Sequence, residues 1–206
     1  KAAIAARLTC ILCVGEMLAD RENGITEELV ALQTKIALMG VEAADMKKQL
    51  RSKMSDDEAA KAQADYILLA LDTYGGAVDA ADSIRSAILR CETPVLAYVN
   101  MQAASAGALI SIACDSIYMR TGSSIGAATV VNQAGEVMPD KYQSFMRGMM
   151  RATAQATGRD PKIAESMVDT ANVLSLTPEE AMAVGFCEGK AESVDEAVRA
   201  VVGDNG

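Results

Sequence analysis

Two hydrophobic runs, each followed by small residues, dominate the middle of the chain. The first covers Ile67–Leu71 and leads into Gly75 and Gly76, and the second covers Val95–Val99. Between them, apolar side chains recur every three or four residues over Val78–Leu89, which predicts a helix. Strands that alternate with helices predict an α/β fold with a mainly parallel sheet. Such sheets bind ligands at the carboxyl ends of their strands.

Shorter patterns predict further elements on both sides of this central unit. The expected strands are Leu8–Val14, Ser116–Met119 and Phe186–Gly189, and Gly122–Gly126 is expected to be a loop. Two helices are expected to begin at Thr26 and at Ser55. Three more are expected from Pro139 to near Gly158, from Lys162 to Val168 and from Ser193 to Val202. A short helix is expected to begin at Thr177, with Pro178 in its first turn and Gly185 after its end.

The amino-acid composition limits which side chains could carry out catalysis. The 206 residues include no histidine, which excludes a Ser-His-Asp triad, a Cys-His dyad and a histidine-ligated zinc ion. Any catalysis must therefore use Ser, Lys, Tyr, Cys or carboxylate groups. The formal net charge of −9 argues against a nucleic-acid partner, because such partners require a basic surface.

Two stretches have a structural interpretation that we prefer to a functional one. Cys10 and Cys13 have C-x-x-C spacing but lie in an apolar strand pattern, which favours core packing over a redox pair. The uncharged stretch Thr93–Cys114 is long enough to cross a bilayer. It contains polar residues and a turn of small residues halfway, so it is predicted to be a buried strand followed by a buried helix.

Two features at the ends of the predicted strands are candidates for chemistry. Gly75 and Gly76 would let backbone N–H groups approach a ligand and stabilise an oxyanion, although a glycine pair is also an ordinary turn. Ser105 is flanked only by small residues. It is either a helix N-cap or a nucleophile that the helix dipole assists.

A nucleophilic serine requires a base, and without histidine the candidate is a neutral lysine. Lys141 lies in the first turn of a predicted helix, where the helix dipole disfavours the ammonium form. Lys162 follows Asp160 and Pro161 in a polar stretch and is predicted to be a surface charge.

Taken together, these features resemble a known family. Residues 64–194 resemble the ClpP-like serine protease domain of the NfeD family, relatives of signal peptide peptidase A. The resemblance rests on LDTYGG (71–76), AASAGA (103–108), IGAA (125–128), DK (140–141), GRDP (158–161) and LTPEEA (176–181).

The resemblance implies a ClpP/crotonase-like α/β fold of repeated β-β-α units, with a mainly parallel sheet and surrounding helices. It implies that Ser105 is the nucleophile and Lys141 the general base. The N–H groups of Gly76 and Ala106 would form the oxyanion hole. The expected substrate cleft comprises Gly75, Ile125, Gly126 and Ala127, and no cofactor or metal is implied.

The resemblance also implies a biological setting. The expected protein is a serine endopeptidase that cleaves apolar segments of membrane-associated proteins. It would form homo-oligomers built from dimers, with a possible stomatin-like partner, beside a bacterial membrane and on its extracytoplasmic (periplasmic) side. Residues 1–206 are expected to form a single ClpP-like domain, in which residues 1–63 supply a divergent strand and a helical insertion.

Two alternatives stay open at this point. A crotonase-like acyl-CoA enzyme would use a similar N–H pair without a nucleophilic serine, and it would require a basic site for the CoA phosphates. A non-catalytic scaffold would keep the fold and bind membrane-protein segments without any reaction at Ser105.

Overall fold

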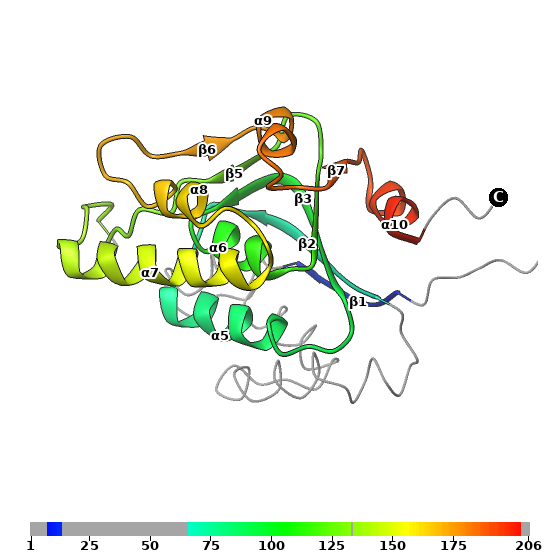
Figure 1. Cartoon of the computed structure of the whole chain (residues 1–206), viewed down its shortest axis with the longest axis horizontal. Coiled ribbons are helices and arrows are strands. Elements are labelled where there is room, and N and C mark those ends of the chain that lie inside the picture. Colours follow the sequence, from blue (N-terminus) through cyan, green and yellow to red (C-terminus); the bar gives the residue numbers. More distant parts are fainter. Residues whose placement is uncertain (1–7, 14–65, 133, 203–206) are drawn as a thin grey trace, which may run out of the picture.

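The computed structural model describes residues 8–13, 66–132 and 134–202, which build a mainly parallel sheet with helices on both faces (Figure 1). The main path of the sheet has the strand order β1-β2-β3-β4-β7, and all of its pairs are parallel. These strands are β1 (Leu8–Cys13), β2 (Tyr66–Thr73), β3 (Val95–Ala104), β4 (Ser116–Met119) and β7 (Gly189–Lys190). The predicted α/β fold class is confirmed.

Two short strands extend the sheet beside the end of β3. β5 (Ser124–Gly126) pairs in parallel with residues 102–104 of β3, and β6 (Ser175–Leu176) pairs antiparallel with β5. The described helices are α5 (Val78–Ile88), α6 (Ala106–Ala113), α7 (Asp140–Ala156), α8 (Pro161–Ser166), α9 (Pro178–Ala183) and α10 (Val194–Val202).

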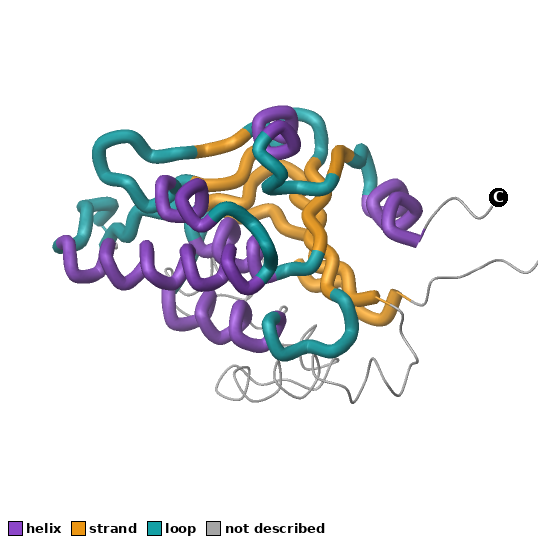
Figure 2. The backbone as a smooth tube through the Cα atoms, viewed as in Figure 1, coloured by secondary structure: helices purple, strands orange, loops and turns teal. Residues whose placement is uncertain are grey.

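Each face of the sheet has its own hydrophobic core, and Figure 2 shows helices on either side of the strands. Ile67, Leu69 and Leu71 belong to the larger core, which α5, α6 and α7 complete. Leu68 belongs to a smaller core on the opposite face, where Ala197 of α10 packs. Because both faces are covered, β2 reads as a continuous apolar run rather than an alternating one.

The uncharged stretch forms a buried strand and a buried helix, as predicted. All eight residues of α6 are buried, so this helix lies inside the larger core rather than on the surface. Among the described residues, no helix has both the length and the apolar character that a bilayer crossing requires.

Two predicted boundaries around β3 are wrong. β3 extends beyond Val99 to Ala104, and its last residues pair with Ser124–Gly126, which was predicted to be a loop. Three residues are too few to show a strand period, so only the pairing partner identifies β5. Gly126 has a φ of 140°, and a Cβ at this position would overlap the carbonyl oxygen of Leu174.

The C-terminal elements confirm some predicted boundaries and correct others. Thr177 caps α9, and its hydroxyl accepts the N–H of Glu180 while the Glu180 carboxylate accepts the N–H of Thr177. The predicted strand Phe186–Gly189 is wrong, because Phe186 is fully buried in the core and the strand is Gly189–Lys190. The helix expected to end at Val168 ends at Ser166.

A buried arginine ties the C-terminal segment to the core. Arg159 is 5% exposed, and its guanidinium donates to the carbonyl oxygens of Phe186 at 3.0 Å and Cys114 at 2.9 Å. It also pairs with the Glu188 carboxylate at 3.3 Å. The GRDP motif thus has a structural role, because its arginine anchors the end of α6 to the segment that leads into β7.

The N-terminal predictions are only partly covered by the structure. The strand expected over Leu8–Val14 is confirmed as β1. The helices expected to begin at Thr26 and at Ser55 lie outside the described residues.

Candidate active site

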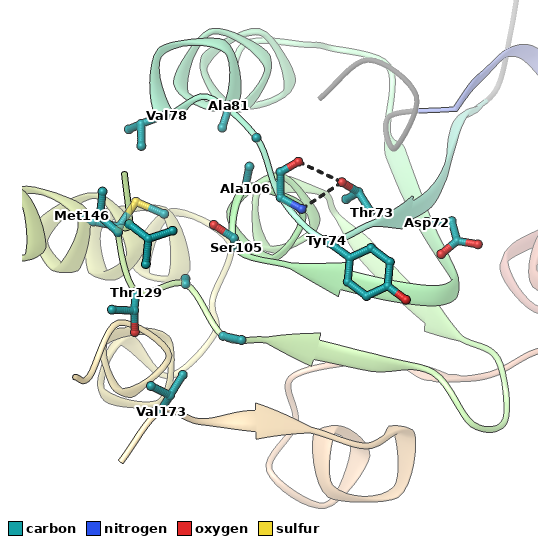
Figure 3. A pocket seen from close by; sticks show the side chains of 16 residues that line it. Asp72, Thr73, Tyr74, Val78, Ala81, Ser105, Ala106, Thr129, Met146 and Val173 are labelled. Carbon is teal, nitrogen blue, oxygen red and sulfur yellow. Dashed lines mark hydrogen bonds between the residues drawn. The ribbon is translucent and has the colours of Figure 1, made fainter. Parts of the chain in front are cut away.

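A cavity of about 580 Å³ opens where β2 and β3 end (Figure 3). Its lining residues come from five parts of the chain: the end of β2 with the start of α5, the start of α6, the segment after β5, the helix α7 and the loop before β6. They are Asp72, Thr73, Tyr74, Gly75, Gly76, Val78, Ala81, Ser105, Ala106, Ala127, Ala128, Thr129, Val130, Val131, Met146 and Val173. The cavity therefore lies where the sequence placed the site.

Ser105 has an unusual backbone conformation at the junction of β3 and α6. Its φ is 54° and its ψ is −114°, a region that non-glycine residues rarely occupy and that costs about 1–3 kcal/mol. The N–H of Ser105 donates to the carbonyl oxygen of Gly126 at 2.8 Å, which holds this turn against β5.

The Ser105 side chain does not cap α6. It makes no capping hydrogen bond, and in Figure 3 its hydroxyl points into the cavity. Ser105 thus occupies the N-cap position of α6, as one interpretation predicted, but its side chain makes no capping bond and remains available. A half-buried hydroxyl that faces a cavity from a strained turn between a strand and a helix is the arrangement that presents a nucleophile.

The loop after β2 lies directly against Ser105. Gly75 has a φ of 134°, and a methyl group at this position would lie 2.8 Å from the Cβ and 3.2 Å from the Oγ of Ser105. Only glycine satisfies both the backbone angle and the space. The close approach of Gly75 to Ser105 goes beyond what a turn requires, and both glycines line the cavity.

Two backbone donors are available beside the Ser105 hydroxyl. Within the described part of the chain, the amide N–H groups of Gly76 and Ala106 have no hydrogen-bond acceptor. The N–H of Ala106 is in the first position of α6, where no intrahelical acceptor exists. Both residues line the cavity, so both donors are free to bind an oxygen atom of a ligand.

Lys141 lies in the first turn of α7 but not in the lining of the cavity. Its side chain is exposed, and its Nζ lies 4.9 Å from the centre of the Tyr142 ring. The neighbouring Asp140 points to solvent and pairs with Arg147 at 2.8 Å. The structure thus brings Ser105, Gly75, Gly76, Ala106 and Ala127 together in the lining of the cavity, and it does not bring Lys141 into that lining.

The two remaining predicted cleft residues, Ile125 and Gly126, are not in the described lining of the cavity. Ile125 is 1% exposed and belongs to the core, and Gly126 supports the Ser105 turn through its carbonyl oxygen. Sequence reasoning missed Met146 and Val173, which line the cavity. The helical period of α7 could have indicated Met146, whereas Val173 lies in a loop without a pattern.

Exposed apolar side chains surround the mouth of the cavity. Tyr74 is 84% exposed, Val131 is 50% exposed and Val173 is 45% exposed, and all three line it. We call these three side chains the apolar rim. Large exposed hydrophobic groups that gather at a cavity indicate a surface for an apolar ligand.

The two buried cysteines Cys114 and Cys187 are poor alternatives as nucleophiles. Cys114 is fully buried, and burial raises the pKa of its thiol. Burial also raises the pKa of the Cys187 thiol to about 11. Because the thiolate is the reactive form, both groups are inert near neutral pH. Among the described residues, no three His, Cys, Asp or Glu side chains gather as metal ligands.

Comparison with solved structures identifies the fold. ClpP1 from Listeria monocytogenes matches with a TM-score of 0.55 at 18% identity, over 73% of this chain and 86% of that one. A probable enoyl-CoA hydratase/isomerase from Mycobacterium abscessus matches with a TM-score of 0.50 at 15% identity, over 80% of this chain and 65% of that one. The chain therefore has the ClpP/crotonase-like fold.

Sequence similarity identifies the family to which this chain belongs. Residues 43–205 match the family described as NfeD1b, N-terminal domain, and the chain belongs to it. Membrane protein NfeD1b from Bacillus subtilis is 37% identical over 153 residues, which are 69% of this chain and 35% of that protein. Membrane-bound protease PH1510 from Pyrococcus horikoshii is 35% identical over 144 residues, which are 66% of this chain and 32% of that protein. The chain thus spans about a third of each relative.

Two solved structures carry names that bear on the site. They are variants of the 1510-N membrane-bound stomatin-specific protease, one with a serine replaced by alanine and one with a lysine replaced by alanine in complex with a substrate peptide. Each is 32% identical with a TM-score of 0.65, over 74% of this chain and 76% and 72% of theirs.

The start of the chain has a second match that sequence reasoning did not anticipate. Residues 1–51 match the triosephosphate isomerase family. The enzyme from Acetivibrio thermocellus is 57% identical over 37 residues, which are 18% of this chain and 15% of that enzyme. Strand β1 comes from this stretch, yet it pairs with β2 of the NfeD-like region. Isomerase chemistry uses a neutral histidine, and this chain has none.

Proposed function

We propose that this chain is a serine endopeptidase domain that uses a Ser-Lys dyad. The observation that carries the proposal is the Ser105 hydroxyl, held on a strained turn and facing the cavity beside the unpaired N–H groups of Gly76 and Ala106. A serine hydroxyl beside two backbone donors supplies the nucleophile and the oxyanion site that acyl transfer requires, and Lys141 would supply the base.

The reaction would proceed through an acyl-enzyme. Neutral Lys141 accepts the proton of the Ser105 hydroxyl, and Oγ forms a bond to the scissile carbonyl carbon. The N–H groups of Gly76 and Ala106 bind the resulting oxyanion. The ammonium group then donates its proton to the leaving amine as the C–N bond breaks. Water, deprotonated by the same lysine, hydrolyses the ester and restores the hydroxyl of Ser105.

The proposal requires Lys141 to leave its place over Tyr142. A lysine side chain has four rotatable bonds, and an exposed cation–π contact is worth only about 0.5–1 kcal/mol. Lys141 also shares α7 with Met146, which already lines the cavity. The two alanine variants of the 1510-N protease support a role for one serine and one lysine in this family.

The proposed substrates are apolar segments of membrane-associated proteins. The apolar rim supports this choice, as does the stomatin-specific protease among the relatives. We extend the proposal to a stomatin-like partner and to oligomers built from dimers. The relatives named as membrane proteins support a place beside the membrane, and we propose the extracytoplasmic side.

The test is hydrolysis of a synthetic apolar peptide, followed by mass spectrometry. Ser105→Ala and Lys141→Ala should each reduce cleavage by about 10³-fold or more, as in other dyads and triads. Lys162→Ala is the matched control, because Lys162 is also exposed and lies in the first turn of α8. Retained cleavage in Lys141→Ala would remove the lysine from the mechanism.

A second candidate is a non-catalytic domain that binds the same segments. The observation in its favour is the position of Lys141 outside the cavity. It predicts that the peptide binds equally well to the wild-type chain and to Ser105→Ala, measured by fluorescence anisotropy, without cleavage by either. A crotonase-like acyl-CoA enzyme gains no such support, because the described lining of the cavity contains no lysine or arginine for the CoA phosphates.

A further inference from the structure

The side chain of Thr73, the last residue of β2, is 4% exposed and lies beneath the loop that carries Gly75 and Gly76. Its hydroxyl makes two hydrogen bonds to one residue: it donates to the carbonyl oxygen of Gly75 at 3.1 Å and accepts the N–H of Gly75 at 3.1 Å (Figure 3). One buried hydroxyl therefore satisfies both polar groups of Gly75, the residue whose φ is 134°.

The direction of the Gly75 carbonyl determines the direction of the next N–H. The carbonyl of Gly75 and the N–H of Gly76 belong to one planar trans peptide, so they point in opposite directions. Since the carbonyl oxygen points at the Thr73 hydroxyl, the N–H of Gly76 points away from it. If this peptide flipped, a carbonyl oxygen would take the place of the proposed oxyanion donor and would repel an oxyanion.

The methyl group of Thr73 connects the same residue to α6. A Cβ added at Gly107 would lie 2.6 Å from the Cγ2 of Thr73, so the methyl packs directly on the backbone of Gly107. Gly107 is the second residue of α6, and Ser105 and Ala106 precede it. Thr73 therefore touches both segments that supply proposed oxyanion donors.

We propose that Thr73 is a positioning residue, whose hydroxyl locks the Gly75–Gly76 peptide with the N–H of Gly76 facing the cavity. This inference rests on the proposed function, because it assigns the orientation of one oxyanion donor. It separates two roles within one side chain. The hydroxyl sets the peptide orientation, and the methyl sets the packing on α6.

Two substitutions separate these roles. Thr73→Val keeps the methyl contact and removes the hydroxyl, whereas Thr73→Ser keeps the hydroxyl and removes the methyl. We expect the rate of fluorophosphonate labelling at Ser105 to fall by about 10²–10³-fold in Thr73→Val, the usual effect of losing one oxyanion donor. In Thr73→Ser the rate should stay within about fivefold of wild type, because one hydrogen-bonding hydroxyl remains.

Thermal unfolding distinguishes positioning from a merely structural role. If Thr73 only supports the fold, the labelling rates of the two variants will follow their melting temperatures. We expect Thr73→Ser to label faster than Thr73→Val even if Thr73→Ser has the lower melting temperature of the two. Labelling losses that simply follow the melting temperatures would overturn the inference.

A measurement independent of catalysis keeps the inference testable if Ser105 proves unreactive. Hydrogen exchange of the Gly75 amide, followed by NMR, should be at least about tenfold faster in Thr73→Val and near wild type in Thr73→Ser, since the hydroxyl is its acceptor. Failure of the wild-type chain to label would contradict the proposed function alone. Unchanged Gly75 exchange in Thr73→Val would contradict the role of Thr73.

Discussion

The two sides of the cavity are built in different ways. On the serine side, backbone groups of Gly75, Gly76 and Ala106 lie around Ser105, and a single added methyl group at Gly75 would touch the hydroxyl. On the lysine side, Lys141 is exposed and rests on Tyr142. The fold therefore fixes the positions of the proposed nucleophile and the proposed oxyanion donors, whereas the proposed base is an exposed, flexible side chain.

The largest expected effect tests how tightly the serine side is built. Gly75→Ala should reduce labelling of Ser105 by about 10²–10³-fold or more, because the new methyl would displace the hydroxyl and the neighbouring donor. Gly122→Ala is the matched control, since Gly122 also has a positive φ (84°) but has no atom within 4 Å of an added Cβ. Equal labelling of the two variants would mean that the loop is not tightly packed on Ser105.

The next effect concerns the buried arginine that holds the C-terminal end of α6, the helix that begins after Ser105. Arg159→Met should lower the free energy of unfolding by about 3 kcal/mol, because buried carbonyl oxygens lose a charged donor. Arg151→Met is the control, and it should cost less than about 1 kcal/mol, since Arg151 forms a partly exposed ion pair with Glu165. Urea unfolding measures both, and a similar loss in both variants would contradict the anchoring role of Arg159.

A pH effect on stability should arise from Cys187, which is buried in the larger hydrophobic core. The folded-state pKa of Cys187 is raised to about 11, so its thiol stays protonated at a pH where the unfolded chain ionises. The protonated thiol therefore contributes fully to the free energy of unfolding below the unfolded-state pKa of about 8.5. Above that pH its contribution falls by about 1.4 kcal/mol per pH unit until the folded-state pKa is reached. Unfolding of Cys187→Ala against pH should lack this part of the decline, and identical curves would contradict it.

The smallest effect tests how loosely the lysine side is held. Tyr142→Leu removes the ring beneath Lys141, a contact worth about 0.5–1 kcal/mol, so labelling at a fixed pH should rise by no more than about fivefold. Phe145→Leu is the control, because Phe145 is an exposed aromatic residue on the same helix. A strong loss of labelling in Tyr142→Leu would show that the ring positions the base instead of holding it aside.

The same difference explains how much the sequence could predict. The strands and helices around Ser105 follow from apolar runs and small residues, which are local signals, and the N-cap at Thr177 is equally local. The strand β5 depends on a partner in β3 that lies about twenty residues away in the chain. Its three residues carry no period of their own, so the sequence could only suggest a loop.

The candidate site shows the same limit. Ser105 and the glycine pair could be found because small residues around one hydroxyl are unusual. The position of the Lys141 side chain could not be predicted, since the rotamers of an exposed lysine depend on its neighbours in space. Thr73 carries no sequence signal for its role, because two hydrogen bonds to one glycine are visible only in three dimensions.

The central claim is that Ser105 is an activated nucleophile with Lys141 as its base. Labelling with a small fluorophosphonate, read by intact mass from about pH 6 to about pH 10, tests it most directly. We expect one adduct on the wild-type chain that forms faster as pH rises, is absent from Ser105→Ala and is strongly reduced in Lys141→Ala. No adduct at any pH, or wild-type labelling of Lys141→Ala, would contradict it.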